Sequence, residues 1–144
     1  NAKGDVTIVS TDKGFSQLLT EAGADERLCL WDAFGRKRID GDSIRQRFGV
    51  EPRQLLDYWA LTGDSTNNIR GVEGIGPKTA KRLLSTYQTL DGVFEQREKE
   101  TEKMAAKLLA HQSQARLCRR LVTLATGLEL GCKLSDFRYI PPIV

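Results

Sequence analysis

The stretch "GVEGIGPKTAKRLL", residues 71–84, places three glycines within six residues and follows them with a proline and three basic side chains. Because glycine adopts positive φ values and leaves room for close approach, the first half predicts a tight reversal of the chain. Pro77 suits the first turn of a helix, where its missing N–H is not needed. The stretch therefore predicts a helix end, a short hairpin and a new helix over about residues 77–87.

The predicted helix after the hairpin has a basic face and an apolar face. Lys78, Lys81 and Arg82 stand at i, i+3 and i+4 and share one side. The other side carries residues expected to pack inward, which are Ala80, Leu83, Leu84 and Tyr87. The N–H groups of Gly74, Gly76 and Lys78 would lie at the helix N-terminus, which favours a phosphate oxygen. The alternative is a plain helix–helix turn with a solvated basic face.

The composition is that of an ordinary globular protein, with 40% hydrophobic and 28% charged residues among 144. No apolar run approaches the ~18 residues of a membrane span, and the chain opens with no basic-then-apolar leader. The three cysteines lie far apart, which argues against a disulfide framework. We therefore expect a protein of the reducing cytoplasm, with no membrane partner.

The charges are distributed unevenly along the chain. Residues 1–40 carry six Lys/Arg against seven Asp/Glu, whereas residues 41–144 carry sixteen against twelve. An acidic end joined to a basic end suggests a polyanion partner that one part holds and the other handles chemically.

The chain divides into three parts by pattern. Residues 1–40 predict a buried strand at 5–10, a helix at 15–22 and a β-hairpin turning at Phe34-Gly35, as at the end of an α/β sheet whose N-terminal half is absent. Residues 41–126 predict helices, one ending at Gly49 and others near 54–62, 77–87, 89–96, 99–111 and 113–126. Residues 127–144 predict a tail that returns to the sheet as a strand.

Two aspartates stand where a catalytic site can form. Asp12 follows a predicted sheet strand, and Asp64 opens the loop before the hairpin. Carboxylates from separate segments can converge on divalent cations that activate water and stabilise a leaving oxygen in phosphodiester hydrolysis. The alternative for each residue is a turn or cap aspartate.

Together, "IVSTDKGFSQLL" (8–19) and "FGVEPRQLLDYWALTGDSTNNIRGVEGIGPKTAKRLL" (48–84) resemble the 5′-nuclease family. That family includes flap endonucleases, the 5′-nuclease domain of bacterial DNA polymerase I and bacterial exonuclease IX. The resemblance implies a fold of the α/β plus all-α class, with a PIN-like (Rossmann-like) nuclease core followed by a helix-hairpin-helix (helix-three-turn-helix) DNA-binding domain. It also implies a monomer of the bacterial cytoplasm that cleaves DNA at a 5′ flap or end.

The resemblance transfers residue by residue. Asp12 and Asp64 match catalytic carboxylates that bind Mg²⁺ or Mn²⁺. The family's usual second Asp is replaced by Gly14 in the first segment and by Asn67 in the second, so the second metal position should be weakened. The remaining carboxylates of the family lie in its N-terminal half, so we expect an incomplete active site in this chain alone.

The hairpin matches the family's duplex-binding element, which implies two sets of residues. The carbonyls of Ile69, Val72 and Ile75 are candidates to hold a K⁺ ion that bridges to a DNA phosphate. The candidate DNA contacts are Gly74, Gly76, Lys78, Thr79, Lys81 and Arg82. The alternative function, suggested by Gly14 and Asn67, is a catalytically degenerate, non-enzymatic module that binds DNA by structure.

Overall fold

The N-terminal part folds as a three-stranded sheet in the order β1-β2-β3. In this computed structural model, which describes residues 4–21 and 27–140, β1 (Val6–Val9) pairs in parallel with β2 (Leu28–Asp32). Strand β2 pairs antiparallel with β3 (Lys37–Ile39). A 3-10 helix, η1 (Lys13–Gln17), and a short helix, α1 (Leu18–Glu21), lie between β1 and β2. The predicted strand and hairpin are therefore confirmed. The helix predicted at 15–22 is a 3-10 helix followed by a short α-helix that ends at Glu21, and residue 22 lies outside the described part.

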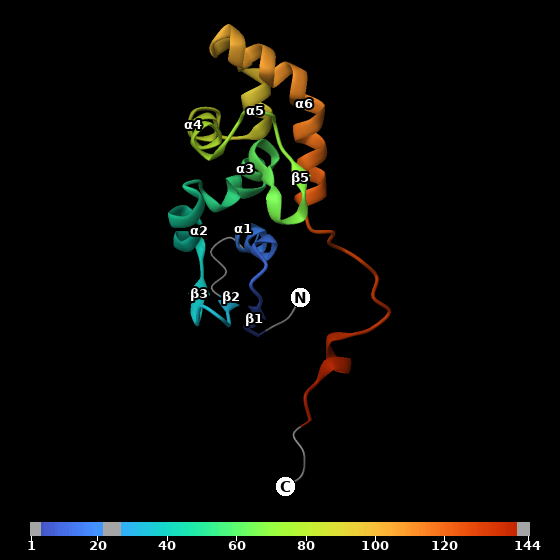
Figure 1. Cartoon of the computed structure of the whole chain (residues 1–144). Coiled ribbons are helices and arrows are strands. Elements are labelled where there is room, and N and C mark those ends of the chain that lie inside the picture. The colour runs from blue at the N-terminus through green and yellow to red at the C-terminus, as the bar shows by residue number, and fades with distance from the viewer. Residues whose placement is uncertain (1–3, 22–26, 141–144) are drawn as a thin grey trace.

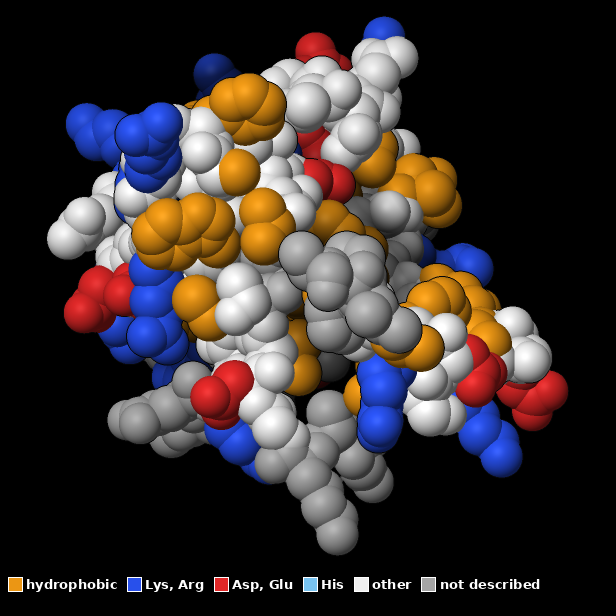
Figure 2. Space-filling model, turned by 90° about the horizontal axis from the view of Figure 1, so that it is seen from below, with side chains coloured by type: hydrophobic (Ala, Val, Ile, Leu, Met, Phe, Trp, Pro, Cys, Tyr) orange, Lys and Arg blue, Asp and Glu red, His pale blue; other side chains and the backbone are white. Residues whose placement is uncertain are grey.

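The prediction that the first strand is buried is wrong for the described residues. Val6 is 39% exposed and Val9 is 62% exposed, and Trp31 in β2 is also at the surface. The reason is that the described elements leave the side chains on both faces of β1 largely uncovered. Figure 2, which views the molecule from below, shows hydrophobic side chains at this surface.

Two short helices connect the sheet to the helical part. Helix α2 (Gly41–Phe48) begins at a capping box, in which Asp40 accepts from the Ser43 N–H, and it ends at Gly49 with a φ of 67°. This left-handed C-cap confirms the predicted helix end. A 3-10 helix, η2 (Pro52–Gln54), then leads directly into α3 (Leu55–Thr62).

A small ribbon and the hairpin follow α3. Strands β4 (Gly63–Asp64) and β5 (Ile69–Arg70) pair antiparallel around a 3-10 turn, η3 (Ser65–Asn67). After the hairpin come α4 (Pro77–Tyr87), α5 (Leu90–Glu95) and the 3-10 turn η4 (Arg97–Lys99). The bounds of α4 confirm the helix predicted after the glycines.

The last helix, α6 (Glu102–Val122), is continuous over 21 residues. The prediction of two helices, at 99–111 and 113–126, is therefore wrong. The segment contains neither glycine nor proline, so nothing interrupts its hydrogen-bond ladder. The side chain of Thr101 caps its first turn. This helix bends along its length and lies beside α3, α5 and β5 (Figure 1).

The core lies in the helical part, with α3 packed against both α4 and α6. Leu55, Leu61 and Leu83 have no exposed surface, and fully burying one such side chain stabilises the fold by about 1.5–3 kcal/mol. The predicted inward face of α4 is confirmed, because each of its members is buried, namely Ala80, Leu83, Leu84 and Tyr87. None of the described helices is both long and apolar enough to cross a membrane.

The tail differs from its prediction. Described residues 127–140 contain a short 3-10 helix, η5 (Leu134–Phe137), and form no strand. The predicted strand is wrong there because Gly131 has a φ of 66°, which interrupts an extended run. The described part of the tail is exposed and runs clear of the helices (Figure 1). The last four residues of the predicted tail lie outside the described part.

Candidate functional site

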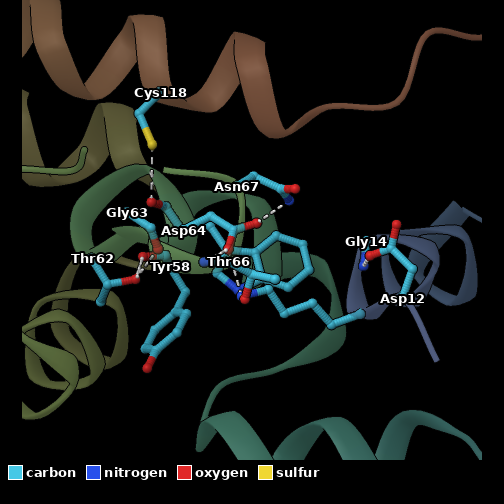
Figure 3. Close-up of polar contacts among 11 residues, drawn as sticks. Asp12, Gly14, Tyr58, Thr62, Gly63, Asp64, Thr66, Asn67 and Cys118 are labelled. Atoms are coloured by element: carbon cyan, nitrogen blue, oxygen red, sulfur yellow. Dashed lines mark hydrogen bonds and ion pairs between the residues drawn. The ribbon is translucent and has the colours of Figure 1, made fainter. Parts of the chain in front are cut away.

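Asp64 is a buried carboxylate at the end of α3, and only 5% of its surface is exposed. The β4–β5 ribbon fixes its backbone, because Asp64 pairs with Ile69. Its Oδ1 accepts a hydrogen bond from the Thr66 N–H at 3.0 Å, and its Oδ2 accepts one from Asn67 Nδ2 at 2.8 Å (Figure 3). Lys13 Nζ lies 2.6 Å from the same Oδ1. Every oxygen of this carboxylate therefore has a donor.

These partners keep Asp64 ionised. Burial alone raises the pKa of this carboxyl, but the hydrogen bonds from Lys13 and Asn67 outweigh it, so the net pKa lies below the usual aspartate value. Because a buried charge is stable only when it is paired and hydrogen-bonded, the surrounding groups form a built site for an anionic oxygen.

Asp12 occupies an exposed turn just before η1. Its side chain caps the turn by accepting from the Gly14 N–H at 2.8 Å, and its own N–H donates to Ser10 Oγ at 3.0 Å. Figure 3 shows Asp12 apart from Asp64, beside Gly14. The contact between the two segments comes from the next residue, Lys13, which also donates to Thr66 Oγ1 at 3.2 Å.

The two departures from the family pattern both act as hydrogen-bond donors here. The Gly14 N–H donates to Asp12, and Asn67 donates to Asp64, where a second Asp would bring a repelling charge. Among residues 4–21 and 27–140, no group of three or more His, Cys, Asp or Glu side chains is placed to hold a metal ion. The two aspartates offer the oxygen ligands that hard cations prefer, so they fit part of a divalent site but not all of one.

The hairpin is built by close backbone contacts. Gly71 lies so near the end of α3 that a methyl group there would stand 2.5 Å from the Leu61 carbonyl oxygen. The Val72 N–H donates to that same carbonyl, and the Ile75 N–H donates to the Val72 carbonyl across the turn. Val72 and Ile75 are each 4% exposed and belong to the core, which explains the apolar residues between the glycines.

The candidate K⁺ ligands come from the end of the ribbon and from the hairpin. Ile69 is in β5 opposite Asp64, and Val72 and Ile75 bracket the tip of the hairpin. Of these carbonyls, that of Val72 already accepts one hydrogen bond and keeps one lone pair.

Helix α4 starts at the open end of the hairpin. Its N-cap, Gly76, is not capped by any side chain of the described residues, so the N–H groups of the first turn face outward from this end. Lys78 is exposed in this turn, and Thr79 is half-buried. The helix N-terminus thus presents donors and a positive side chain together.

The predicted basic stripe is divided by its partners. Arg82 makes a two-pronged ion pair with Glu100, at 2.8 and 2.5 Å, and Tyr87 donates to the same carboxylate at 2.9 Å. Lys81 lies against Gly49, where a methyl group would stand 2.7 Å from its Nζ. Of the three cations, Lys78 is the one in the first turn of α4, and Arg82 is mainly a structural partner of Glu100.

The structure adds a cation that the sequence interpretation missed. Lys107, from α6, reaches the hairpin tip so closely that a methyl group on Gly74 would collide with its Nζ. Gly74 has a φ of 70°, which already favours glycine. Lys107 stands in a mixed-charge segment whose pattern is typical of a solvated helix, so no local signal could indicate this contact.

Comparison with known proteins gives a consistent result. The family described as 5′-3′ exonuclease, C-terminal SAM fold, matches residues 50–143. Flap endonuclease Xni from Psychromonas ingrahamii is 45% identical over 132 residues, which cover 92% of this chain and 48% of that protein. This chain therefore spans about half the length of that relative.

Solved structures show the same fold. A mutant of T5 5′-exonuclease matches with a TM-score of 0.70 and 24% identity, over 82% of this chain and 47% of that one. A zinc-bound structure of T5 5′-exonuclease matches with the same score and identity, over 82% of this chain and 42% of that one. At this identity the likeness concerns the fold. Because the family model covers more than half of the residues, the chain belongs to the 5′-3′ exonuclease family.

Proposed function

We propose that this chain is part of a structure-specific 5′-nuclease, a flap endonuclease or 5′-3′ exonuclease, that hydrolyses DNA phosphodiesters with a divalent metal ion. The observation that carries the proposal is the Lys13–Asp64 contact at 2.6 Å, because it joins the turn of Asp12 to the loop that opens the hairpin. A carboxylate site and a phosphate-binding hairpin thereby belong to one connected surface. The flap endonuclease relative supports the same activity.

In this proposal the sheet is the edge of a larger PIN-like core. The exposed side chains of Val6, Val9 and Trp31 support it, because both faces of a sheet in an α/β protein are normally covered by other elements. The division into residues 1–40, 41–126 and 127–144 stays a prediction, as do a monomeric state and a cytoplasmic location.

Asp12 and Asp64 would hold the divalent ion, Mg²⁺ or Mn²⁺, together with carboxylates of a longer protein. When bound, such an ion activates water and stabilises the leaving oxygen. The chain's own groups hold the ligands ready: the Gly14 N–H orients Asp12, and Asn67 and Thr66 orient Asp64. Zinc ions are bound in one of the matching T5 5′-exonuclease structures, which supports a divalent site in that protein.

The hairpin would hold the duplex by its phosphates. The backbone N–H groups of Gly74, Gly76, Lys78 and Thr79, with the Lys78 and Lys107 side chains, provide donors and positive charge without reading bases. A K⁺ ion on the carbonyls of Ile69, Val72 and Ile75 would add a bridge to phosphate. The bacteriophage T5 flap endonuclease has been solved in a pseudo-enzyme-product complex with DNA and metal ions, which supports DNA as the partner.

The test is cleavage of a 5′-flap duplex by the full-length protein in Mg²⁺ or Mn²⁺. We expect Asp64→Ala to reduce the rate strongly, and Asp91→Ala, which removes an exposed aspartate paired with Arg116, to leave it unchanged. Absence of cleavage by the wild type in every metal would overturn the proposal.

The second candidate function is a degenerate DNA-binding module, which Gly14 and Asn67 favour because each replaces an expected carboxylate. It predicts duplex binding that falls steeply with salt but no cleavage under any metal. Measuring affinity and cleavage on the same flap substrate separates the two functions.

A further inference from the structure

Two buried glutamines occupy equivalent places in the chain. "FSQLL" (15–19) and "PRQLL" (52–56) each put a glutamine at the last residue of a 3-10 helix, directly before an α-helix. Gln17 is 3% exposed and Gln54 is 5% exposed. Each side chain bonds to the backbone at the C-terminal end of another helix, where carbonyls lack partners within their own helix.

Gln17 connects the Asp12 turn to the end of α6. Its Nε2 donates to the Gly14 carbonyl at 2.8 Å and to the Val122 carbonyl at 3.1 Å. Its Oε1 accepts from the Leu124 N–H at 2.9 Å. Val122 is the last residue of α6, and Gly14 belongs to the turn that Asp12 caps. The Gln17 side-chain amide therefore donates to both segments, and it also accepts a hydrogen bond from the residue two positions after α6.

The same helix reaches the hairpin at other points along its length. Lys107 contacts the hairpin at Gly74, and Gln114 Nε2 donates to the Arg70 carbonyl at 2.8 Å, just before the glycines. Cys118 lies against α3, with its Sγ 3.2 Å from the Trp59 carbonyl oxygen. At about 1.5 Å per residue, the helix from Lys107 to Val122 spans about 22 Å. Helix α6 is thus one continuous helix that joins the hairpin to the Asp12 turn (Figure 1).

We propose that Gln17 is a positioning residue that sets which phosphodiester is cut, by fixing the Asp12 turn at one distance from the hairpin. This inference rests on the proposed nuclease function. If the hairpin binds the duplex by its phosphates, the length and attachment of α6 determine which phosphodiester bond lies at the Asp12 turn. Successive nucleotides of one strand are spaced by about 3.4 Å along the duplex, so a turn released by a few ångströms can meet the neighbouring bond.

Two sets of polar bonds add to the packing of η1 and α1 against η2. Lys13 ties the turn to Asp64 and Thr66 in the loop before the hairpin, and Gln17 ties it to α6. Of these, the Gln17 bonds join the turn to the end of α6, the helix that also contacts the hairpin tip. A defined cleavage position requires this distance to be fixed.

The test is Gln17→Met in the full-length nuclease, which keeps the size of the side chain and removes the amide that bonds to Gly14, Val122 and Leu124. On an end-labelled 5′-flap duplex we expect the main product of the wild type to be joined by products displaced by about one nucleotide. We also expect kcat to fall by about 10- to 100-fold, with KM and duplex affinity unchanged, because the hairpin is intact.

The chain offers a matched control in Gln54→Met. Gln54 also bonds to the backbone through its side-chain amide, at the Leu84 and Gln88 carbonyls and the Glu51 N–H, but within the helical part. We expect this variant to lose a similar amount of thermal stability and to keep the product length of the wild type. An equal change in product length for both variants would show a general loss of rigidity and overturn the inference.

A second variant covers the case in which Gln17→Met does not fold. Leu124→Pro removes the N–H that Gln17 Oε1 accepts, and Thr123 already has the extended backbone, with ψ of 126°, that precedes a proline. Displaced products from it support the inference, and unchanged products overturn it. A wild type that cleaves, with Gln17→Met giving the same products at the same kcat, refutes only the positioning role. A wild type that never cleaves refutes the proposed function and this role with it.

Discussion

Lys13 Nζ lies 2.6 Å from Asp64 Oδ1 and 3.2 Å from Thr66 Oγ1, so one ammonium group joins two segments that are far apart in the sequence. The side chains of Lys13 and Asp64 are only 19% and 7% exposed. The ion pair is therefore partly withdrawn from water, where removing one partner leaves a charge that solvent compensates poorly.

We expect Lys13→Met to lower the free energy of unfolding by about 1–3 kcal/mol at pH 7 without divalent ions, because Asp64 then lacks its cation. Urea denaturation followed by circular dichroism measures it. Lys103→Met, which changes an exposed lysine in α6, is the control and should alter stability by less than about 0.5 kcal/mol. Equal effects of the two substitutions would contradict a structural role for the Lys13–Asp64 pair.

The Glu100 carboxylate predicts a dependence of stability on pH. The ion pair with Arg82 lowers the pKa of Glu100, against the raising effect of burial, and the Tyr87 hydroxyl adds to the lowering. The pKa of Glu100 in the folded protein lies below its value of about 4.3 in the unfolded chain. Ionised Glu100 therefore stabilises the fold fully above about pH 4.3, and this stabilisation is lost as the pH falls through the folded pKa. Comparing wild type with Glu100→Gln from pH 7 to pH 3 measures it. The difference in unfolding free energy should be constant at high pH and shrink below about pH 4.

Substitutions of Arg82 and of Lys78 should affect different properties, the first protein stability and the second binding of duplex DNA. Arg82→Gln removes both prongs of the bond to a carboxylate that is 8% exposed, so we expect a loss of about 1–3 kcal/mol in the free energy of unfolding. Lys78→Gln should leave stability within about 0.5 kcal/mol and weaken duplex binding. Thermal melts measure the stability of both variants, and fluorescence anisotropy on the same samples measures their affinity for the duplex. If the two variants bound duplex equally poorly while melting alike, Arg82 would be a phosphate ligand, as the sequence pattern predicts.

The position of Lys107 predicts how the affinity for duplex DNA depends on salt. If its ammonium group contacts a phosphate beside Gly74, then Lys107→Gln should reduce the slope of log affinity against log salt by about one. Lys37→Gln, which has the same change in charge in strand β3 at the far end of the molecule from α4, should leave the slope nearer that of the wild type (Figure 1). Identical slopes for wild type and Lys107→Gln would remove Lys107 from the contact surface.

The hairpin and α4 could be predicted from the sequence because their signals are local. The glycine spacing, Pro77 and the 3.6-residue pattern of α4 all lie within one short stretch. The pattern also predicted that Leu83 and Leu84 face inward, and both are fully buried. Local chemistry was therefore enough to establish this element.

The partners of the charged residues could not be predicted, because tertiary contacts decide them. Arg82 fits a basic stripe until α4 packs beside the loop that carries Glu100, and Lys107 fits a solvated helix until α6 passes the hairpin tip. Asn67 looked like a lost metal ligand, and only its hydrogen bond to Asp64 shows a positive role for the amide. The continuity of α6 was also missed, since a polar middle segment carries no marker for joining two predicted helices.

Gly74 and Gly76 give the last test of the hairpin, because they lie two residues apart in different conformations. Gly74 has a φ of 70°, and a methyl group there would also collide with Lys107. Gly76 has a φ of −93° and a ψ of −176°, which any residue adopts, and no described atom lies within 4 Å of the place for its Cβ. The two positions therefore predict different responses to the same substitution.

We expect Gly74→Ala to lower the free energy of unfolding by about 1–2 kcal/mol, the usual effect of a left-handed backbone on a residue with a side chain. It should also weaken duplex binding, because the added methyl group displaces the Lys107 ammonium from the hairpin tip. Gly76→Ala should change stability by less than about 1 kcal/mol, since only the helix N-cap is altered. Urea denaturation and anisotropy with a short duplex measure both effects. If Gly76→Ala destabilised the protein more than Gly74→Ala, the left-handed conformation would have to be assigned to Gly76 instead.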